Sequence, residues 1–191
     1  GTGHVMRCLT LASALREHGA AISFICRNHD GHLCHLIEKR GFSVSRLSTP
    51  RAETQGKHRS TYAVCSASSW QEDAEQTRAA IGALGVEPDW LVVDHYNLDQ
   101  RWESALRTSA DRIMVIDDLA DRKHDCDLLL DQNLVGHLST RYVGKVPATC
   151  GVLLGLSYAL LQPIYAELHD RVPPRDGAVR RILVFMGGAD Q

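Results

Sequence analysis

Short apolar runs alternate with helical segments along most of this chain, and that alternation constrains the fold more than any other feature. The run Trp90–Val93 leads directly into Asp94, and "RIMVIDDL" ends in two acids in the same way. A helical segment, 100–109, separates these two runs. Parallel strands need such crossover helices, so the sequence predicts an α/β fold with a Rossmann-like parallel sheet and helices on both faces.

The other predicted elements continue this alternation. Further strands are expected in "AAISFICR", "FSVSRL", "CDLLLDQN" and "GVLLG". Apolar residues at helical spacing predict a first helix that ends at Gly19. Three more helices are expected in "GHLCHLIEKRG", "SWQEDAEQTRAAIGALG" and "SYALLQPIYAELHDRV", and the polar stretch 48–69 is predicted to be a long loop.

Composition excludes several classes of protein. The 191 residues are 44% hydrophobic and carry a net charge of −2, with no block of Lys and Arg, so no nucleic-acid partner is expected. No apolar run approaches the roughly 20 residues that span a bilayer, and a signal-peptide layout is missing, so we expect a cytoplasmic protein without membrane contact. No CxxC pair occurs, and we expect reduced thiols at all six cysteines: Cys8, Cys26, Cys34, Cys65, Cys126 and Cys150.

The two ends of the sequence suggest a longer protein. Residues 1–170 are predicted to form one Rossmann-like domain, and "RVPPRDGAVR" (171–180) has the prolines and mixed charge of a linker. Residues 181–191 then indicate the first strand and Gly-Gly turn of a second domain. A Gly-x-Gly turn normally follows a strand, so a strand is expected before Gly1. We therefore expect a fragment that is cut at both ends.

The opening turn carries a candidate catalytic residue. Gly1 and Gly3 lead into a helix whose first N–H groups favour an anion or a polarised oxygen. The same helix end disfavours protonation of His4, which can then accept a proton as a general base. Arg7, one turn along, can hold a phosphate or a carboxylate. The alternatives are a plain strand-to-helix turn with an exposed histidine, and a surface arginine in a helix salt bridge.

Polar residues follow the predicted strands, where ligands collect in open parallel sheets. Asp94 can orient His4 or a sugar hydroxyl, or instead cap the next helix, and Tyr96 can hydrogen-bond a sugar. Asp117 and Asp118 can bind a divalent metal with diphosphate, but capping is favoured because no third oxygen ligand is evident. Two other stretches, 131–133 and 155–160, either line a polar pocket or are ordinary turns. The stretch 185–190 is either a diphosphate-binding turn or a plain turn.

The order of these motifs resembles one family. The chain resembles the UDP-sugar hydrolases of pseudaminic acid biosynthesis and spore-coat polysaccharide proteins. The resemblance is carried, in this order, by "GTGHVMR", "VVDHY", "IDD" before "HDCDLLLDQN", "GLSYALL" and finally "MGGAD". Those enzymes resemble glycosyltransferases of the two-Rossmann-domain (GT-B) type, such as the one that adds N-acetylglucosamine in peptidoglycan synthesis.

The resemblance implies an activity and a set of site residues. The reaction is hydrolysis of UDP-2,4-diacetamido-2,4,6-trideoxy-β-L-altrose to the free sugar and UDP, without a cofactor or a metal. The sugar lies between two domains, and UDP is held mainly by the C-terminal one. The catalytic residue is then His4, and the residues that bind the substrate are Gly3, Arg7, Asp94, Tyr96, Asn133 and Tyr158, with Gly187 and Gly188 in the UDP-binding turn.

Two other functions remain compatible with the same residues. A GT-B glycosyltransferase would use the same fold and UDP-sugar donor but transfer the sugar to an acceptor hydroxyl. A non-catalytic nucleotide-sugar-binding module would bind without turnover. Fold alone does not separate these functions, because function depends on the site.

Overall fold

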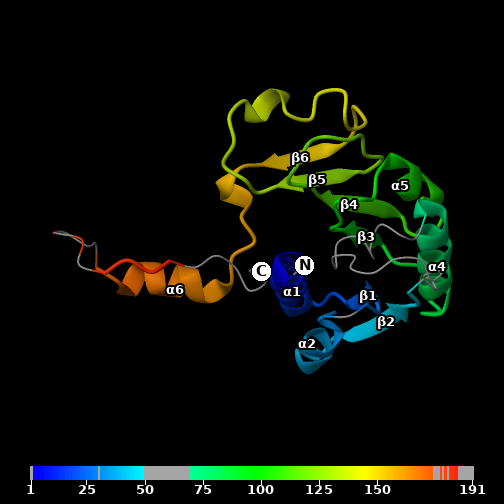
Figure 1. The fold of residues 1–191 in the computed structure, drawn as a ribbon, viewed down its shortest axis with the longest axis horizontal. Coiled ribbons are helices and arrows are strands. Elements are labelled where there is room, and N and C mark those ends of the chain that lie inside the picture. The colour runs from blue at the N-terminus through cyan, green and yellow to red at the C-terminus, as the bar shows by residue number, and fades with distance from the viewer. Residues whose placement is uncertain are drawn as a thin grey trace, which may run out of the picture.

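The computed structural model describes residues 2–29, 31–49, 69–173, 177, 179 and 181–184. Its strands form two parallel sheets (Figure 1). One sheet pairs β1 (Ser23–Arg27) with β2 (Ser43–Leu47). The other has the order β3-β4-β5-β6, formed by Trp90–Val93, Arg112–Ile116, Leu128–Asp131 and Gly151–Leu154. The predicted α/β class with parallel strands and interleaved helices is confirmed.

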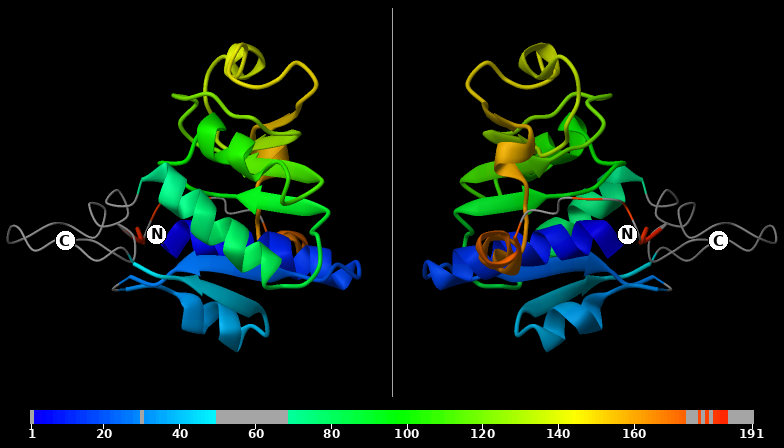
Figure 2. Two further views of the ribbon diagram at one scale, coloured as in Figure 1. Left: turned by 90° about the vertical axis from the view of Figure 1, so that its right-hand side faces the viewer. Right: turned by 90° about the vertical axis from the view of Figure 1, so that its left-hand side faces the viewer.

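Helices lie on both faces of this arrangement, and α6 lies apart from it (Figure 2). They are α1 (Thr2–Glu17), α2 (Cys34–Lys39), α4 (Trp70–Gly82), α5 (Gln100–Leu106) and α6 (Pro163–Arg171), with short 3₁₀ turns η1 (Leu138–Thr140) and η2 (Leu156–Tyr158). Local sequence explains their ends. Ser69 caps α4 by accepting a hydrogen bond from the Glu72 amide, and Asp99 caps α5 in the same way from Arg101. Gly19 follows α1 with a φ of 89°, a conformation that glycine adopts without strain.

The helix predicted from Ser157 begins later than expected. Residues 156–158 form η2, and α6 starts only at Pro163. Gln162, directly before that proline, is extended (φ −63°, ψ 143°), because the proline ring disfavours helical backbone in the preceding residue. Proline itself suits the first turn of a helix.

Side chains of β4 point alternately into two separate cores. Ile113 and Val115 pack with Trp102 and Leu106 of α5. Met114 and Ile116, on the other face, pack with Leu130 and with Cys8 and Leu11 of α1. A central parallel strand is buried on both faces in this way, which explains its continuous apolar run.

Helix α1 connects the two sheets. Its Cys8 and Leu11 contact the β4–β5 core, while Leu9 and Ala12 pack against Ile37 and the neighbouring Phe42 in a third core beside β1 and β2. The small two-stranded sheet is therefore held to the rest through α1 as well as through α4, which contacts both β2 and α5.

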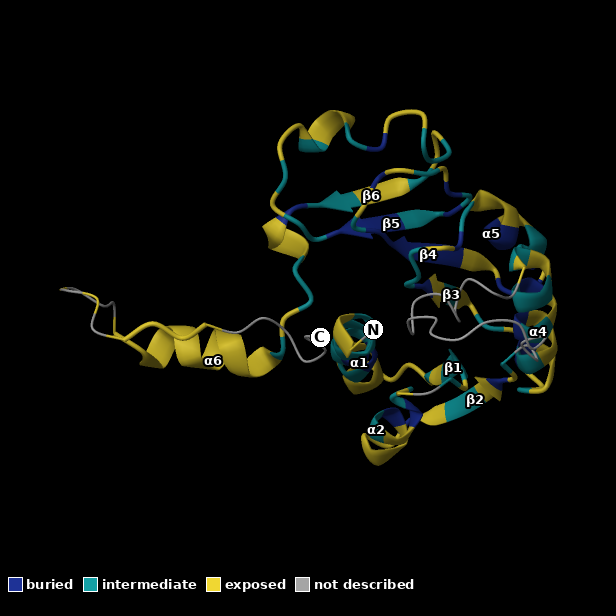
Figure 3. Ribbon diagram, in the orientation of Figure 1, coloured by how far each residue is buried: buried dark blue, intermediate teal, exposed yellow. Residues whose placement is uncertain are grey.

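Helix α6 lies apart from these cores (Figure 3). None of its residues is buried, and Ile164, Tyr165 and Leu168 are exposed. Residues 181–184, part of the strand predicted at 181–191, are exposed and have no strand assignment. The remaining residues of that segment lie outside the described residues, so the second-domain assignment stays a prediction.

Two further sequence predictions can be compared with the structure. The described cysteines, which exclude Cys65, are all free thiols. Among the described helices, none combines the length and the apolar character that crossing a membrane requires.

The strands β1 and β3 each lack a partner on one edge within the described residues, and these two edges face each other in Figure 1. Trp90 and Val92 of β3 are 40% and 37% exposed although both are apolar. We expect a parallel strand, formed by residues before Gly1, to pair with both edges. Amide hydrogen exchange in β1 and β3 should then be fast in this chain and slower in a longer version; equal rates in both would contradict this topology.

Leu129 of β5 should contribute strongly to stability because its side chain is fully buried in the core that also contains Val115 of β4 and Leu106 of α5. Leu129→Ala is expected to lower the free energy of unfolding by about 2–5 kcal/mol. Leu134→Ala removes the same atoms from a residue that is 76% exposed and should change it by less than about 0.5 kcal/mol. Urea denaturation of both variants measures the difference, and similar losses would contradict the assignment of the core.

Candidate functional site

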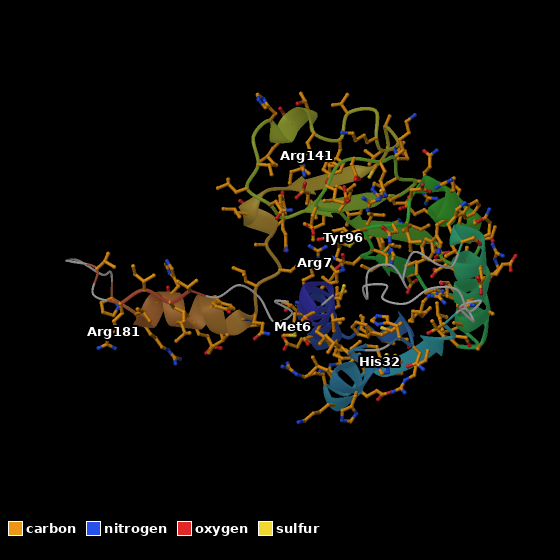
Figure 4. The ribbon with its side chains drawn as sticks, in the orientation of Figure 1. Met6, Arg7, His32, Tyr96, Arg141 and Arg181 are labelled. Atoms are coloured by element: carbon orange, nitrogen blue, oxygen red, sulfur yellow. The ribbon has the colours of Figure 1, made fainter. Side chains whose placement is uncertain are left out.

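The first turn of α1 lies over the carboxyl ends of β3 and β4. His4 and Arg7 are three residues apart on this helix and share a face. Both approach Asp94, the residue that follows β3. Figure 4 shows Arg7 and Tyr96 near each other between α1 and the larger sheet. The opening helix and the end of β3 therefore meet in one cluster of polar side chains.

Arg7 binds two carboxylates of the protein. Its Nε and Nη2 donate to the two oxygens of Asp94 at 2.7 and 2.5 Å. Its Nη1 donates to both oxygens of Asp118 at 2.8 and 2.7 Å. Burial by itself would lower the pKa of Arg7, but the hydrogen bonds and charges of Asp94 and Asp118 raise it well above its usual value. The sequence left open whether Asp94 caps a helix; instead it pairs with Arg7, and Asp99 is the cap of α5.

Asp118 joins three elements of the fold. Besides Arg7 of α1, it accepts a hydrogen bond from the Tyr96 hydroxyl after β3, at 3.1 Å. It also accepts one from Asn133 Nδ2 after β5, at 3.0 Å. Burial would raise the pKa of Asp118, but these hydrogen bonds and the charge of Arg7 lower it below its usual range, so the carboxylate is ionised at neutral pH.

His4 is next to this cluster and partly open to solvent. Its Nε2 is 3.9 Å from Asp94 Oδ1, too far for a hydrogen bond, and its side chain is 20% exposed. Its ring meets the Tyr96 ring edge-on, with centroids 4.5 Å apart and planes at 79°. Burial lowers the pKa of His4 below 6.5, against an opposing effect of Asp94. A histidine that is mostly neutral at pH 7 can accept a proton from water.

A second network lies beside the first and was not expected from the sequence. Arg141, in the segment after η1, donates through Nε to Asp131 at 2.6 Å and through Nη2 to the Asp118 carbonyl oxygen at 2.7 Å. The buried Tyr142 hydroxyl is 3.0 Å from an oxygen of Asp117 and from one of Asp131. Burial, together with these two carboxylates, raises the pKa of Tyr142.

Asp117, the other member of the acid pair, has a local structural role. It accepts backbone hydrogen bonds from Leu119 and Ala120, which fix the turn after β4. No described helix lies between β4 and β5, so neither acid caps a helix as predicted; Asp117 fixes a turn and Asp118 pairs with Arg7. In the part of the chain that the structure describes, no group of three or more His, Cys, Asp or Glu side chains is arranged to hold a metal ion.

The remaining predicted residues are placed differently. Asn133 belongs to the Asp118 cluster, whereas Tyr158 of η2 is 45% exposed and has no hydrogen bond to that cluster within the described residues. Gly3 lies in the first turn of α1 with open space where a side chain would project. Gly1, Gly187 and Gly188 lie outside the described residues.

Comparison with known proteins agrees with the resemblance. The chain is 26% identical, over 192 residues, to the UDP-2,4-diacetamido-2,4,6-trideoxy-beta-L-altropyranose hydrolase of Campylobacter jejuni. The match covers all of this chain and 57% of that protein, so the chain spans little more than half the length of its curated relative. A scan against protein-family models finds no match. The chain is thus a distant homologue of this hydrolase, as its motifs indicate.

Proposed function

We propose that this chain is the sugar-binding and catalytic half of a nucleotide-sugar hydrolase. Its reaction would be the cleavage of a UDP-linked 2,4-diacetamido-2,4,6-trideoxy sugar into the free sugar and UDP, by attack of water at the anomeric carbon. The proposal takes the substrate from the distant hydrolase and assigns UDP to a C-terminal domain that starts near residue 181, after a linker at 171–180.

The position of His4 is the observation that carries this proposal. Its imidazole is partly exposed at the start of α1, beside Asp94 and the Tyr96 ring, and burial keeps it neutral. UDP is a good leaving group, so strong help from a general acid is not needed. The enzyme must instead position one water and remove its proton as an oxocarbenium-like transition state forms. A neutral imidazole does both.

Asp94 fits a supporting role in the same reaction. At 3.9 Å from His4 Nε2, its carboxylate favours the imidazolium that forms when His4 takes the proton from water. Burial lowers the resting pKa of His4 more than Asp94 raises it, and the charge of Arg7 lowers it further. His4 is thus neutral before it takes the proton, and its imidazolium form is stabilised by Asp94 afterwards.

A glycosyltransferase is the second candidate, since it would use the same fold and donor. The full-length protein should be incubated with the UDP-diacetamido-trideoxy sugar in ¹⁸O-labelled water without an acceptor. Label on the sugar supports hydrolysis at the anomeric carbon, and label on UDP would mean attack at phosphorus. Release of UDP only after an acceptor is added would support the transferase, and binding without any release would support a binding module.

Replacement of His4 tests the catalytic assignment. His4→Ala in the full-length protein should lower kcat by roughly 10²–10⁴-fold, the usual contribution of a general base. His18→Ala removes an exposed histidine after the end of the same helix and should leave kcat unchanged. Steady-state measurement of UDP release compares the two, and an unchanged rate in His4→Ala would refute the role of His4.

The pH profile tests the charge environment of His4. Because the base acts when neutral and its pKa lies below 6.5, kcat/KM should stay level above that pH and fall only at lower pH. Asp94 raises the pKa of His4, so Asp94→Asn should move this fall to still lower pH. Asp111→Asn, at an exposed position next to the amino end of β4, is the control and should not move it. A shift towards higher pH in Asp94→Asn would contradict the assignment.

A further inference from the structure

The hydrogen bonds of Asp118 determine what Tyr96 can offer to a ligand. An ionised carboxylate only accepts hydrogen bonds, so at the 3.1 Å contact with Asp118 Oδ2 the Tyr96 hydroxyl must be the donor. A phenol has a single proton. Once that proton is directed to Asp118, the Tyr96 oxygen presents only lone pairs to the site.

The side-chain amide of Asn133 is also held so that it can only accept a hydrogen bond from a ligand. Its Nδ2 lies 3.0 Å from Asp118 Oδ1 and 2.9 Å from Asp131 Oδ1. An amide oxygen in that place would face two carboxylate oxygens, so the amide orientation follows from the neighbours rather than from its own shape. Both N–H bonds of the amide are thereby used, and its carbonyl oxygen is the group left for a ligand.

Arg7 directs most of its N–H groups to the protein. Its Nε and Nη1 and one N–H of Nη2 are directed to Asp94 and Asp118. Two carboxylates around one guanidinium also leave one negative charge in excess. The site is therefore rich in acceptors and unfavourable for an anionic or acceptor-only group of a ligand.

From this geometry we propose that Asp118 is a positioning residue that determines specificity, because it fixes Tyr96 and Asn133 as acceptors for hydrogen-bond donors of the sugar. The groups that fit are the N–H of an acylamino substituent or a hydroxyl. This inference rests on the proposed function and on the resemblance, which implies that Tyr96 and Asn133 bind the substrate.

The test compares UDP-sugars that differ by a single donor. In the full-length protein, kcat/KM and Kd are measured for the diacetamido sugar and for two analogues in which one acetamido group is replaced by acetoxy. The ester keeps the shape of the substituent but lacks the N–H. At least one analogue should lose roughly 10-fold or more in both constants, as expected for a lost hydrogen bond with an unpaired acceptor. Equal constants for all three sugars would overturn the inference.

Asp118→Asn then tests the source of this preference. Tyr96 and Asn133 donate to different oxygens of Asp118, so in either orientation the new N–H₂ replaces the acceptor of one of them. The residue that loses its acceptor then releases a donor into the site. The preference for acetamido over acetoxy should fall several-fold. Asp121→Asn, an exposed aspartate paired with Arg122, is the matched control and should keep it. An unchanged preference in a folded Asp118→Asn would overturn the inference. If that variant does not fold, Tyr96→Phe, which removes the acceptor itself, should lower the preference instead.

The outcomes separate this inference from the proposed function. Tighter binding of the acetamido sugar without release of UDP would refute hydrolysis and leave the role of Asp118 standing. Hydrolysis of all three sugars with equal kcat/KM would support the proposed hydrolase function and refute the role of Asp118 in specificity. Failure to bind any of the three would overturn both.

Discussion

The pairing of Arg7 with Asp94 and Asp118 is the interaction on which the site depends. The Asp94 side chain is only 4% exposed and that of Asp118 16%, so both charges need a partner. Removing one partner of such a buried pair typically costs about 3–5 kcal/mol, because the remaining charge is left uncompensated. The same contacts fix α1 against the carboxyl ends of β3 and β4. Because His4 is one turn from Arg7 on that helix, its position follows from the ion pairs.

The packing of α1 reinforces this arrangement. Leu9 and Ala12 face the core beside β1 and β2, while Cys8 and Leu11 face that of the larger sheet. A helix with apolar contacts on two sides has little freedom to rotate about its axis. The ion pairs then specify one orientation among the few that packing allows. The open edges of β1 and β3 lie on either side of the position where a strand leading into α1 would run.

Most of the fold could be predicted from the sequence because it depends on local pattern. Apolar runs such as Trp90–Val93 predicted the strands, and Gly19 predicted the end of the first helix as a C-cap glycine. The start of α6 at Pro163 was missed because apolar spacing outweighed the effect of that proline.

Site contacts were predictable only in part. The sequence brought His4, Arg7 and Asp94 together, because helix N-termini and strand ends share one edge of a parallel sheet. It did not indicate Asp118 as the shared partner of Arg7, Tyr96 and Asn133, and Arg141 carries no motif at all. Arg7 and Asp118 are 111 residues apart, so their pairing depends on the sheet order rather than on spacing. The "IDD" motif was the one available signal for Asp118, and it left the two acids equivalent.

The charge distribution also supports the proposed binding of UDP by a second domain. A diphosphate requires cations or free N–H groups, yet Arg7 and Arg141 are both directed to carboxylates of this chain. With one negative charge in excess around Arg7, a diphosphate placed here would be repelled. A neutral sugar that presents N–H and hydroxyl groups meets no such penalty. These charges support the proposal that this half binds the sugar and that UDP is bound elsewhere.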